Sequence, residues 1–132
     1  MPTLDHVTLT VSDYARSKTF YEKALAPLGI RAVMDFGQAC GFGREGKPDF
    51  WIGAGPSSFQ NAEQLRIITP THIAFAAQSR SEVEAFHAAA LEAGGKDFGK
   101  PGLRTHYHPD YYGAFVLDPD GHDIEAVFHG SR

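Results

Sequence analysis

Disulfides, membrane spans and basic clusters are all missing from this sequence. Its single cysteine, Cys40, excludes an internal disulfide and any zinc site made of cysteines alone. No stretch approaches the roughly 20 consecutive apolar residues of a transmembrane helix, and the polar start does not resemble a signal peptide. Lys and Arg form no run and the formal net charge is −4, which argues against a nucleic-acid partner. We therefore expect a cytoplasmic protein that binds neither membrane nor nucleic acid.

The amino-acid composition is typical of a single folded domain. The chain has 132 residues, of which 42% are hydrophobic, with ten Phe and five Tyr. This length suits one hydrophobic core, so we predict a single domain over residues 1–132. Seven histidines stand out, and they are candidates for metal binding or proton transfer.

Two parts of the chain follow the same pattern of strand and helix. Residues 4–11 are rich in β-branched side chains and predict a strand, and Ser12 and Asp13 offer caps for a helix that ends near Pro27 and Gly29. Residues 71–77 predict a second short strand. A possible capping box, either Ser79 with Glu82 or Ser81 with Glu84, then starts a helix that stops at residues 94–95.

A shift of 66 residues superposes these two segments, which indicates an internal duplication. Four pairs of residues coincide in register: His6 with His72, Phe20 with Phe86, Leu25 with Leu91, and Gly29 with Gly95.

Each predicted helix is followed by material that is typical of antiparallel hairpins. Residues 113–117 and 123–128 flank the strong turn sequence Asp-Pro-Asp-Gly-His, and residues 39–43 and 49–53 flank a looser turn. We predict an α+β fold of two βαβββ modules, residues 4–53 and 71–128, joined by a loop-like connector at residues 54–70. Residues 65–68 of the connector are compatible with a strand extension.

Three strand positions carry the strongest candidates for a metal site. His6 and His72 occupy equivalent positions of the repeat, and Glu125 lies in an apolar strand, where a carboxylate is costly unless it is paired or binds a cation. Two imidazoles and one carboxylate suit Fe, Mn, Ni or Zn. The alternative is that each histidine is an ordinary core or edge residue and that Glu125 pairs with an arginine.

Three segments resemble the vicinal oxygen chelate superfamily, which includes glyoxalase I, extradiol dioxygenases, fosfomycin resistance enzymes and bleomycin resistance proteins. These are residues 4–11 (LDHVTLTV), 71–75 (THIAF) and 117–125 (LDPDGHDIE). The resemblance implies a curled mixed β-sheet around a metal site, with helices outside. It also implies that His6, His72 and Glu125 hold one divalent metal ion.

Differences from better-known members narrow the expected activity. Trp51 stands where glyoxalase I has a fourth ligand, and an indole cannot bind a metal, so we do not expect strict glyoxalase I activity. Extradiol dioxygenases place a His and a Tyr before the final hairpin. By this resemblance His106, His108 and Tyr112 are catalytic candidates; the alternative is that this segment is a solvated aromatic turn.

A partly apolar pocket is expected beside the metal. Its predicted members are Thr8, Trp51, Phe75, Arg104 and Phe115. If Asp118 pairs with His122 in the last hairpin, Phe115 lies opposite Glu125.

The sequence therefore predicts a divalent-metal-dependent enzyme of the glyoxalase or dioxygenase type. Its substrate is expected to be a small metabolite that binds the metal through two adjacent oxygens. The reaction type stays open among lyase, isomerase, ring-cleaving dioxygenase and thiol transfer. The alternative is a metal-free protein that sequesters a small molecule, as bleomycin resistance proteins do. We expect a homodimer, because members of the family often pair modules across chains.

Overall fold

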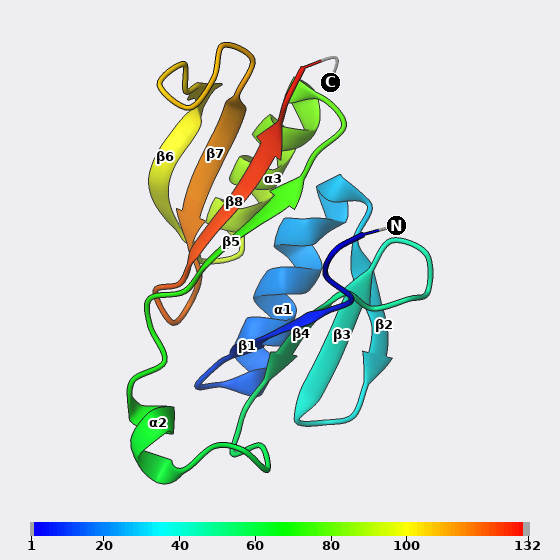
Figure 1. Cartoon of the computed structure of the whole chain (residues 1–132), viewed down its shortest axis with the longest axis vertical. Coiled ribbons are helices and arrows are strands. Elements are labelled where there is room, and N and C mark those ends of the chain that lie inside the picture. The colour runs from blue at the N-terminus through cyan, green and yellow to red at the C-terminus, as the bar shows by residue number, and fades with distance from the viewer. Residues whose placement is uncertain (1, 131–132) are drawn as a thin grey trace.

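The computed structural model, which describes residues 2–130, contains the predicted unit of strand, helix and three strands twice (Figure 1). The first module consists of β1 (Val7–Thr10), α1 (Tyr14–Leu25), the 3-10 turn η1 (Ala26–Leu28), β2 (Arg31–Asp35), β3 (Ala39–Gly43) and β4 (Phe50–Gly53). The connector contains α2 (Ala62–Arg66). The second module consists of β5 (His72–Ala76), α3 (Arg80–Glu92), β6 (Lys96–Leu103), β7 (Tyr112–Leu117) and β8 (Asp123–Phe128).

Each module forms its own four-stranded mixed sheet. The strand orders are β1-β4-β3-β2 and β5-β8-β7-β6, and the first pair of each sheet is parallel. Thr8 lies beside Trp51 in the first sheet, and Ala74 lies beside Glu125 in the second. Thr8 and Ala74, which are 66 residues apart, therefore occupy equivalent positions in the two sheets. Trp51 in the first sheet is equivalent to Glu125 in the second.

Local sequence signals set the limits of both long helices. Asp13 caps α1 by accepting a hydrogen bond from the Arg16 amide (3.1 Å), and Gly29 takes a left-handed conformation after η1 (φ 76°). The Ser79 hydroxyl caps α3 through the Glu82 amide (3.1 Å). The Glu82 carboxylate bonds the Gln78 amide rather than that of Ser79, so the predicted capping box is only half formed.

The connector differs from the prediction. Leu65 and Arg66 belong to the short helix α2, so the suggested strand extension at residues 65–68 is wrong. Asn61 and Gln64 form a complete capping box, in which each side chain bonds the other residue's amide at 2.9 Å. This local pairing starts a helical turn that the surrounding polar residues did not reveal.

The two helices lie on the same side of the molecule, behind the two sheets in the view of Figure 1. Helix α1 packs against α3, and the inner face of each sheet packs against the helices. The core is formed by buried side chains from both modules: Leu9, Phe20, Tyr21, Phe42, Phe50, Ile52, Val83, Phe86, Val116 and Ile124. In residues 2–130 no strand of one sheet pairs with a strand of the other, so the chain forms two adjacent sheets rather than one curled sheet.

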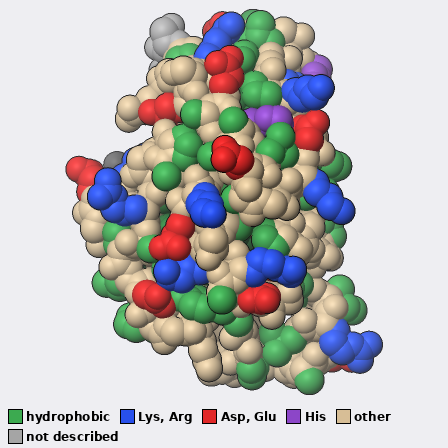
Figure 2. All heavy atoms as spheres, turned by 180° about the vertical axis from the view of Figure 1, so that it is seen from behind, with side chains coloured by type: hydrophobic (Ala, Val, Ile, Leu, Met, Phe, Trp, Pro, Cys, Tyr) green, Lys and Arg blue, Asp and Glu red, His purple; other side chains and the backbone are tan. Residues whose placement is uncertain are grey.

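No helix among the described residues covers the opposite face of either sheet. Figure 1 looks onto these faces, whereas Figure 2, turned by 180°, shows the helix side of the molecule, where acidic and basic side chains are interspersed. Within residues 2–130 no helix has the length and apolar character needed to cross a membrane.

The turn between β7 and β8 fastens the second module to the first. The Tyr21 hydroxyl of α1 donates a hydrogen bond to the Asp118 carboxylate (2.5 Å). The Ser12 amide and hydroxyl, at the start of the first helix, both donate to the Asp120 carboxylate, the amide at 3.1 Å. The Asp-Pro-Asp-Gly-His segment is therefore more than a hairpin turn: it is the joint between the modules.

His122 completes this joint from a fully buried position. Its Nδ1 atom accepts a hydrogen bond from the Thr71 amide (3.1 Å), and its Nε2 atom lies 3.0 Å from the Thr10 carbonyl oxygen. An amide can only donate and a carbonyl can only accept, so the ring is neutral with its proton on Nε2. One side chain thus joins the end of β1 to the start of β5.

We predict that His122→Ala lowers the free energy of unfolding by about 3 kcal/mol, because two backbone groups lose their partner and a buried space is left. Urea denaturation followed by circular dichroism measures this loss. The control His106→Ala removes an exposed ring and should change stability by less than about 0.5 kcal/mol. Equal free energies of unfolding for the two variants would show that His122 does not hold the two modules together.

Candidate metal and substrate site

The uncovered face of the second sheet carries the main group of candidate residues. Across its strands, Ala74 of β5 lies beside Glu125 of β8, Glu125 lies opposite Phe115 of β7, and Phe115 lies opposite Gly99 of β6. The predicted pairing of Phe115 with Glu125 is confirmed. Directly opposed residues on neighbouring strands point to the same face, and Ile124 and Ala126, on either side of Glu125, lie in the core. Glu125 and Phe115 therefore point to the uncovered side.

Glu125 is a buried carboxylate on this face. It is 1% exposed, and burial raises its pKa above the ordinary value, against the opposing effect of hydrogen bonds. The Tyr111 hydroxyl donates to its Oε2 atom, and the other oxygen, Oε1, lies 3.2 Å from Nε2 of His72. A Cβ atom at Gly113 would lie 3.0 Å from Oε2, so this glycine makes room for the carboxylate.

His72 is oriented by Asp123 at its other ring nitrogen. Nδ1 lies 3.0 Å from the Asp123 carbonyl oxygen and 3.2 Å from its Oδ2 atom. Both partners accept, so the proton of a neutral ring resides on Nδ1 and Nε2 directs a lone pair at Glu125. Two electron-pair donors that face each other at this distance require a cation between them, which is either a proton or a metal ion.

The distance also suits a metal ion. Two ligands of one ion lie roughly 3 to 3.5 Å apart, because each bond is about 2.1 Å long. A metal-bound histidine usually donates its second N–H to a carboxylate or carbonyl, as His72 does to Asp123. The pair His72 and Glu125 therefore fits a divalent metal.

The third predicted ligand, His6, lies on the other sheet. It precedes β1, is half-exposed, and its Nδ1 atom lies 2.7 Å from the Asp5 carboxylate. That contact, followed by those of Lys47, lowers the pKa of Asp5. Like His72, His6 thus has Nδ1 held by an aspartate and Nε2 turned away from it.

The chain does not bring the predicted three ligands together. No group of three or more His, Cys, Asp or Glu side chains among residues 2–130 is arranged to hold a metal. A groove of about 530 Å³ between β1 and β5 is lined by Asp5 and His72, but neither His6 nor Glu125 lines it. Within one chain the site is therefore a pair, His72 and Glu125, and His6 stands apart.

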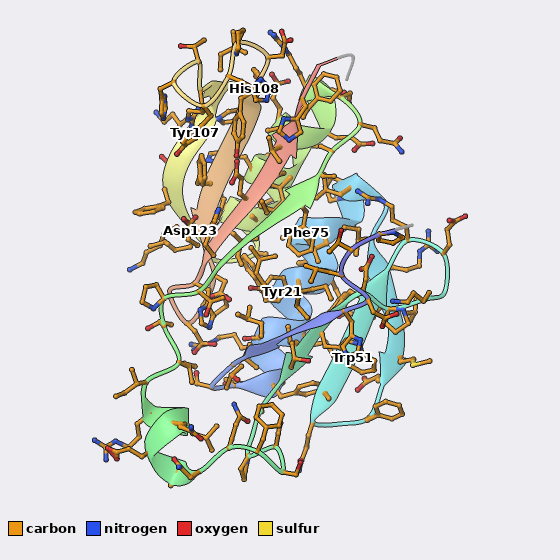
Figure 3. All side chains as sticks on the ribbon, in the orientation of Figure 1. Tyr21, Trp51, Phe75, Tyr107, His108 and Asp123 are labelled. Carbon is orange, nitrogen blue, oxygen red and sulfur yellow. The ribbon has the colours of Figure 1, made fainter. Side chains whose placement is uncertain are left out.

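Thr8 and Trp51 flank His6 on the uncovered face of the first sheet. Together with Met34 and Pro48 they line a hollow of about 330 Å³ beside His6. The exposed ring of Phe36 stacks on the indole at a centroid distance of 5.9 Å. Figure 3 shows Trp51 on this sheet, well away from Asp123 on the other. The hollow beside His6 therefore has an aromatic wall, and an indole stands where the second sheet has the carboxylate of Glu125.

Phe75 lies elsewhere than predicted. Its ring packs edge-to-face on Phe50 (5.0 Å between centroids) and lines the groove between the modules. Phe75 follows Ala74, which lies beside Glu125, so alternation along β5 turns its side chain to the opposite face. It belongs to the core rather than to the face with Glu125.

Tyr112 also faces the helices. Its hydroxyl donates to the Glu84 carboxylate of α3 (2.6 Å), and Arg80 lies over its ring. The preceding residue, Tyr111, reaches Glu125 instead. The structure thus places Tyr111 where the sequence analysis expected Tyr112. A shift of one residue at the start of β7 moves each side chain to the other face of the sheet. The sequence of the loop before β7 did not show at which residue the strand pairing begins.

The two remaining histidine candidates belong to an aromatic cluster at the end of the second sheet, where Figure 3 labels Tyr107 and His108. His108 packs against Tyr111 (5.4 Å between centroids), and its Nε2 atom lies 2.7 Å from Nδ1 of His129. His106 packs on Tyr107 further from the sheet. His108 therefore contacts directly the tyrosine that bonds Glu125, whereas the ring of Tyr107 lies between His106 and that tyrosine.

Sequence reasoning missed three residues of this site. Asp5 and Asp123 orient the two histidines, and Tyr111 holds Glu125. The Asp5–His6 dipeptide was a visible signal, since an acidic neighbour is a common partner for a ligand histidine. Asp123 could have been found from the strand pairing that places it beside His72.

Comparison with known proteins identifies the family of this fold. Residues 3–126 match the Glyoxalase/Bleomycin resistance protein/Dioxygenase superfamily. The chain belongs to this superfamily. A glyoxalase/bleomycin resistance protein from Albidiferax ferrireducens T118 is 31% identical, with a TM-score of 0.76, over 96% of this chain and 98% of that one.

Two further members of the superfamily share the fold at lower identity. A glyoxalase-related enzyme from Fulvimarina pelagi is 20% identical (TM-score 0.68) over 97% of this chain and 88% of its own. A glyoxalase/bleomycin resistance protein/dioxygenase family enzyme from Burkholderia phytofirmans PsJN is also 20% identical (TM-score 0.69), over 97% and 99%. No curated protein matches the chain significantly.

We predict that Tyr111→Phe raises the pKa of Glu125 in metal-free protein, because the lost hydrogen bond had stabilised the carboxylate. Carbon-detected NMR titration of the Glu125 carboxyl measures the shift. Tyr112→Phe is the matched control, since its hydroxyl bonds Glu84 on the other face and its loss should leave Glu125 unchanged. A larger shift in Tyr112→Phe than in Tyr111→Phe would contradict the assigned faces.

Proposed function

We propose that this protein is a divalent-metal-dependent enzyme of the glyoxalase or dioxygenase type. Its substrate is a small metabolite that offers two adjacent oxygens to the metal. The observation that carries the proposal is the approach of His72 Nε2 and Glu125 Oε1 to 3.2 Å, with Nδ1 of the same ring directed at Asp123. Membership of the superfamily, which includes metal-dependent enzymes, supports it.

The third ligand in this proposal is His6 of a second copy of the chain. The uncovered faces of both sheets point to the same side of the molecule (Figure 1), so they cannot close on each other within one chain. Exposed aromatic rings lie on each module, among them Phe36 and Phe98. A twofold axis would place the first sheet of each copy over the second sheet of the other and cover these rings.

The chain's own residues prepare the substrate site in several ways. Asp5 and Asp123 hold the two imidazoles with Nε2 available, and Tyr111 fixes the second oxygen of Glu125. The metal would supply Lewis acidity that polarises a bound carbonyl or hydroxyl oxygen. Trp51 and Phe115 add apolar walls. Because Trp51 cannot ligate, positions on the metal stay open for two substrate oxygens, and strict glyoxalase I activity is not expected.

Proton transfer in this scheme falls to the aromatic cluster. Tyr111 lies against Glu125, and burial together with the adjacent carboxylate raises its pKa, so the hydroxyl keeps its proton at neutral pH. His108 packs on the Tyr111 ring, and it is the better placed of the two predicted proton carriers. His106 stands further out, and Tyr112 faces the helices.

One observation favours the alternative of a metal-free binding protein. A proton between His72 and Glu125 satisfies both groups as well as a metal does, and burial already raises the pKa of Glu125. The second function is therefore sequestration of a small molecule between the sheets, as in bleomycin resistance proteins.

Metal analysis separates the two functions. Untagged protein is expected to retain one divalent ion per chain, and His72→Ala to lose it while keeping its circular dichroism spectrum. His87→Ala, which removes a histidine bonded to Asp97 on the helix side, is the control and should keep the metal. Wild-type protein that stays metal-free after reconstitution would favour sequestration.

Mixing two variants tests whether the site crosses a dimer. His6→Ala and His72→Ala should each bind no metal alone. A mixed dimer contains one intact site, made from His6 of one chain and His72 and Glu125 of the other, so mixing should restore metal binding. A site formed within one chain would stay empty in every mixture, and that result would contradict the shared arrangement.

A further inference from the structure

We infer that Arg104 forms a carboxylate-binding subsite at the far side of the face that carries His72 and Glu125. The substrate is then a flat molecule with adjacent oxygens at one end and a carboxylate at the other. This inference rests on the proposed function, in which the adjacent oxygens bind at His72 and Glu125.

Backbone contacts hold Arg104 in place at the end of β6. Its Nη1 atom donates to the Gly102 carbonyl (2.9 Å) and its Nη2 atom to the Lys100 carbonyl (2.7 Å). The guanidinium carbon lies 5.5 Å from the centre of the Phe115 ring. The side chain therefore folds back over the sheet instead of extending into solvent, and its position is fixed before any ligand arrives.

Two glycines provide the space for this guanidinium. A Cβ atom at Gly99 would lie 2.8 Å from Cδ1 of Phe115 and 3.1 Å from Nη2 of Arg104. A Cβ atom at Gly102 would lie 3.2 Å from Nη1. A side chain at Gly99 would force the Phe115 ring to shift and would crowd the guanidinium, so this glycine leaves room for both side chains.

The charge of Arg104 has no carboxylate partner in the part of the chain that the structure describes. Among residues 2–130 no acidic side chain forms an ion pair with it. A guanidinium has five N–H groups, and two of these are used by the backbone carbonyls. The others are available for the bidentate contact that arginine makes with a planar carboxylate.

The row of paired residues across the sheet sets the shape of the ligand. Glu125 lies opposite Phe115, and Phe115 lies opposite Gly99, over which the guanidinium sits. Two strand spacings, about 10 Å, therefore separate Glu125 from Arg104. The ring of Phe115 lies between them and stacks beside His72 (6.1 Å between centroids). A flat ligand that passes over Phe115, with polar groups at both ends, matches this span.

The test compares two probes that differ only in charge at one end. 3,4-Dihydroxybenzoate carries two adjacent oxygens, a flat ring and a carboxylate, and 3,4-dihydroxybenzamide is its neutral counterpart. Isothermal titration calorimetry on the full chain, both metal-free and loaded with Zn²⁺, should show about tenfold tighter binding of the benzoate. Arg104→Gln should abolish this preference and Arg104→Lys should restore part of it.

Arg16→Gln is the matched control, because Arg16 is exposed on α1 and its loss should leave the preference intact. Equal affinities of wild-type protein for the two probes, or no binding of either at millimolar concentration, would overturn the inference. So would a preference that survives in Arg104→Gln.

The Zn²⁺ arms separate this inference from the proposed function. If Zn²⁺ strengthens neither probe but the carboxylate preference still depends on Arg104, the metal proposal fails and the subsite stands. If Zn²⁺ strengthens both probes equally and the carboxylate gives no advantage, the subsite is wrong and the metal proposal stands.

Discussion

The attachment of the Asp118–His122 turn to the first module is the constraint on which the rest of the structure depends. Tyr21, Ser12 and the Thr10 carbonyl hold the turn from one side, and the Thr71 amide holds it from the other. Because the turn begins β8, its anchoring also sets the register in which Glu125 lies beside Ala74 and opposite Phe115. The same contacts that join the modules therefore aim the buried carboxylate at His72. A single neutral histidine tautomer, fixed by two backbone groups, connects stability to the candidate site.

Much of the fold could be predicted from local signals, because the interactions that end helices and form turns join residues only a few positions apart in the sequence. The cap at Asp13, the left-handed Gly29 and the turn before β8 determine where elements begin and end, and the repeat shows that they occur twice. The pairing of His72 with Glu125 was likewise accessible, since two parallel neighbouring strands present their side chains on one face. The face of Phe75 was equally implied by alternation along its strand, but an aromatic residue near a predicted ligand was assigned to the pocket.

Other features depend on geometry that no local pattern contains. Tyr111 and Tyr112 are adjacent, and only the exact start of β7 decides which of them bonds Glu125. Arg104 was predicted as a pocket residue, but the β6–β7 pairing has irregular register, so counting back from Phe115 does not give its position on the sheet. The separation of His6 from His72 arises from the packing of α1 on α3, which turns both sheets to the same side. The symmetry of the repeat predicts that His6 and His72 occupy equivalent positions in their sheets. It does not predict whether the two side chains lie close together.

The two sheets share one plan but differ in charge, and in the proposed site this difference would give them different parts. Glu125, His72 and Arg104 all lie on the second sheet, whereas the equivalent place to Glu125 on the first sheet holds Trp51, stacked by Phe36. In the proposed site a carboxylate on both sheets would bring two negative charges to one ion, whereas the indole leaves only one of them and adds an apolar wall. In the proposed dimer the second sheet would supply the charged groups and the first would supply His6 and the apolar wall. Each face of the open chain lacks what the other holds, so this division suits an arrangement in which two copies lay unlike sheets against each other.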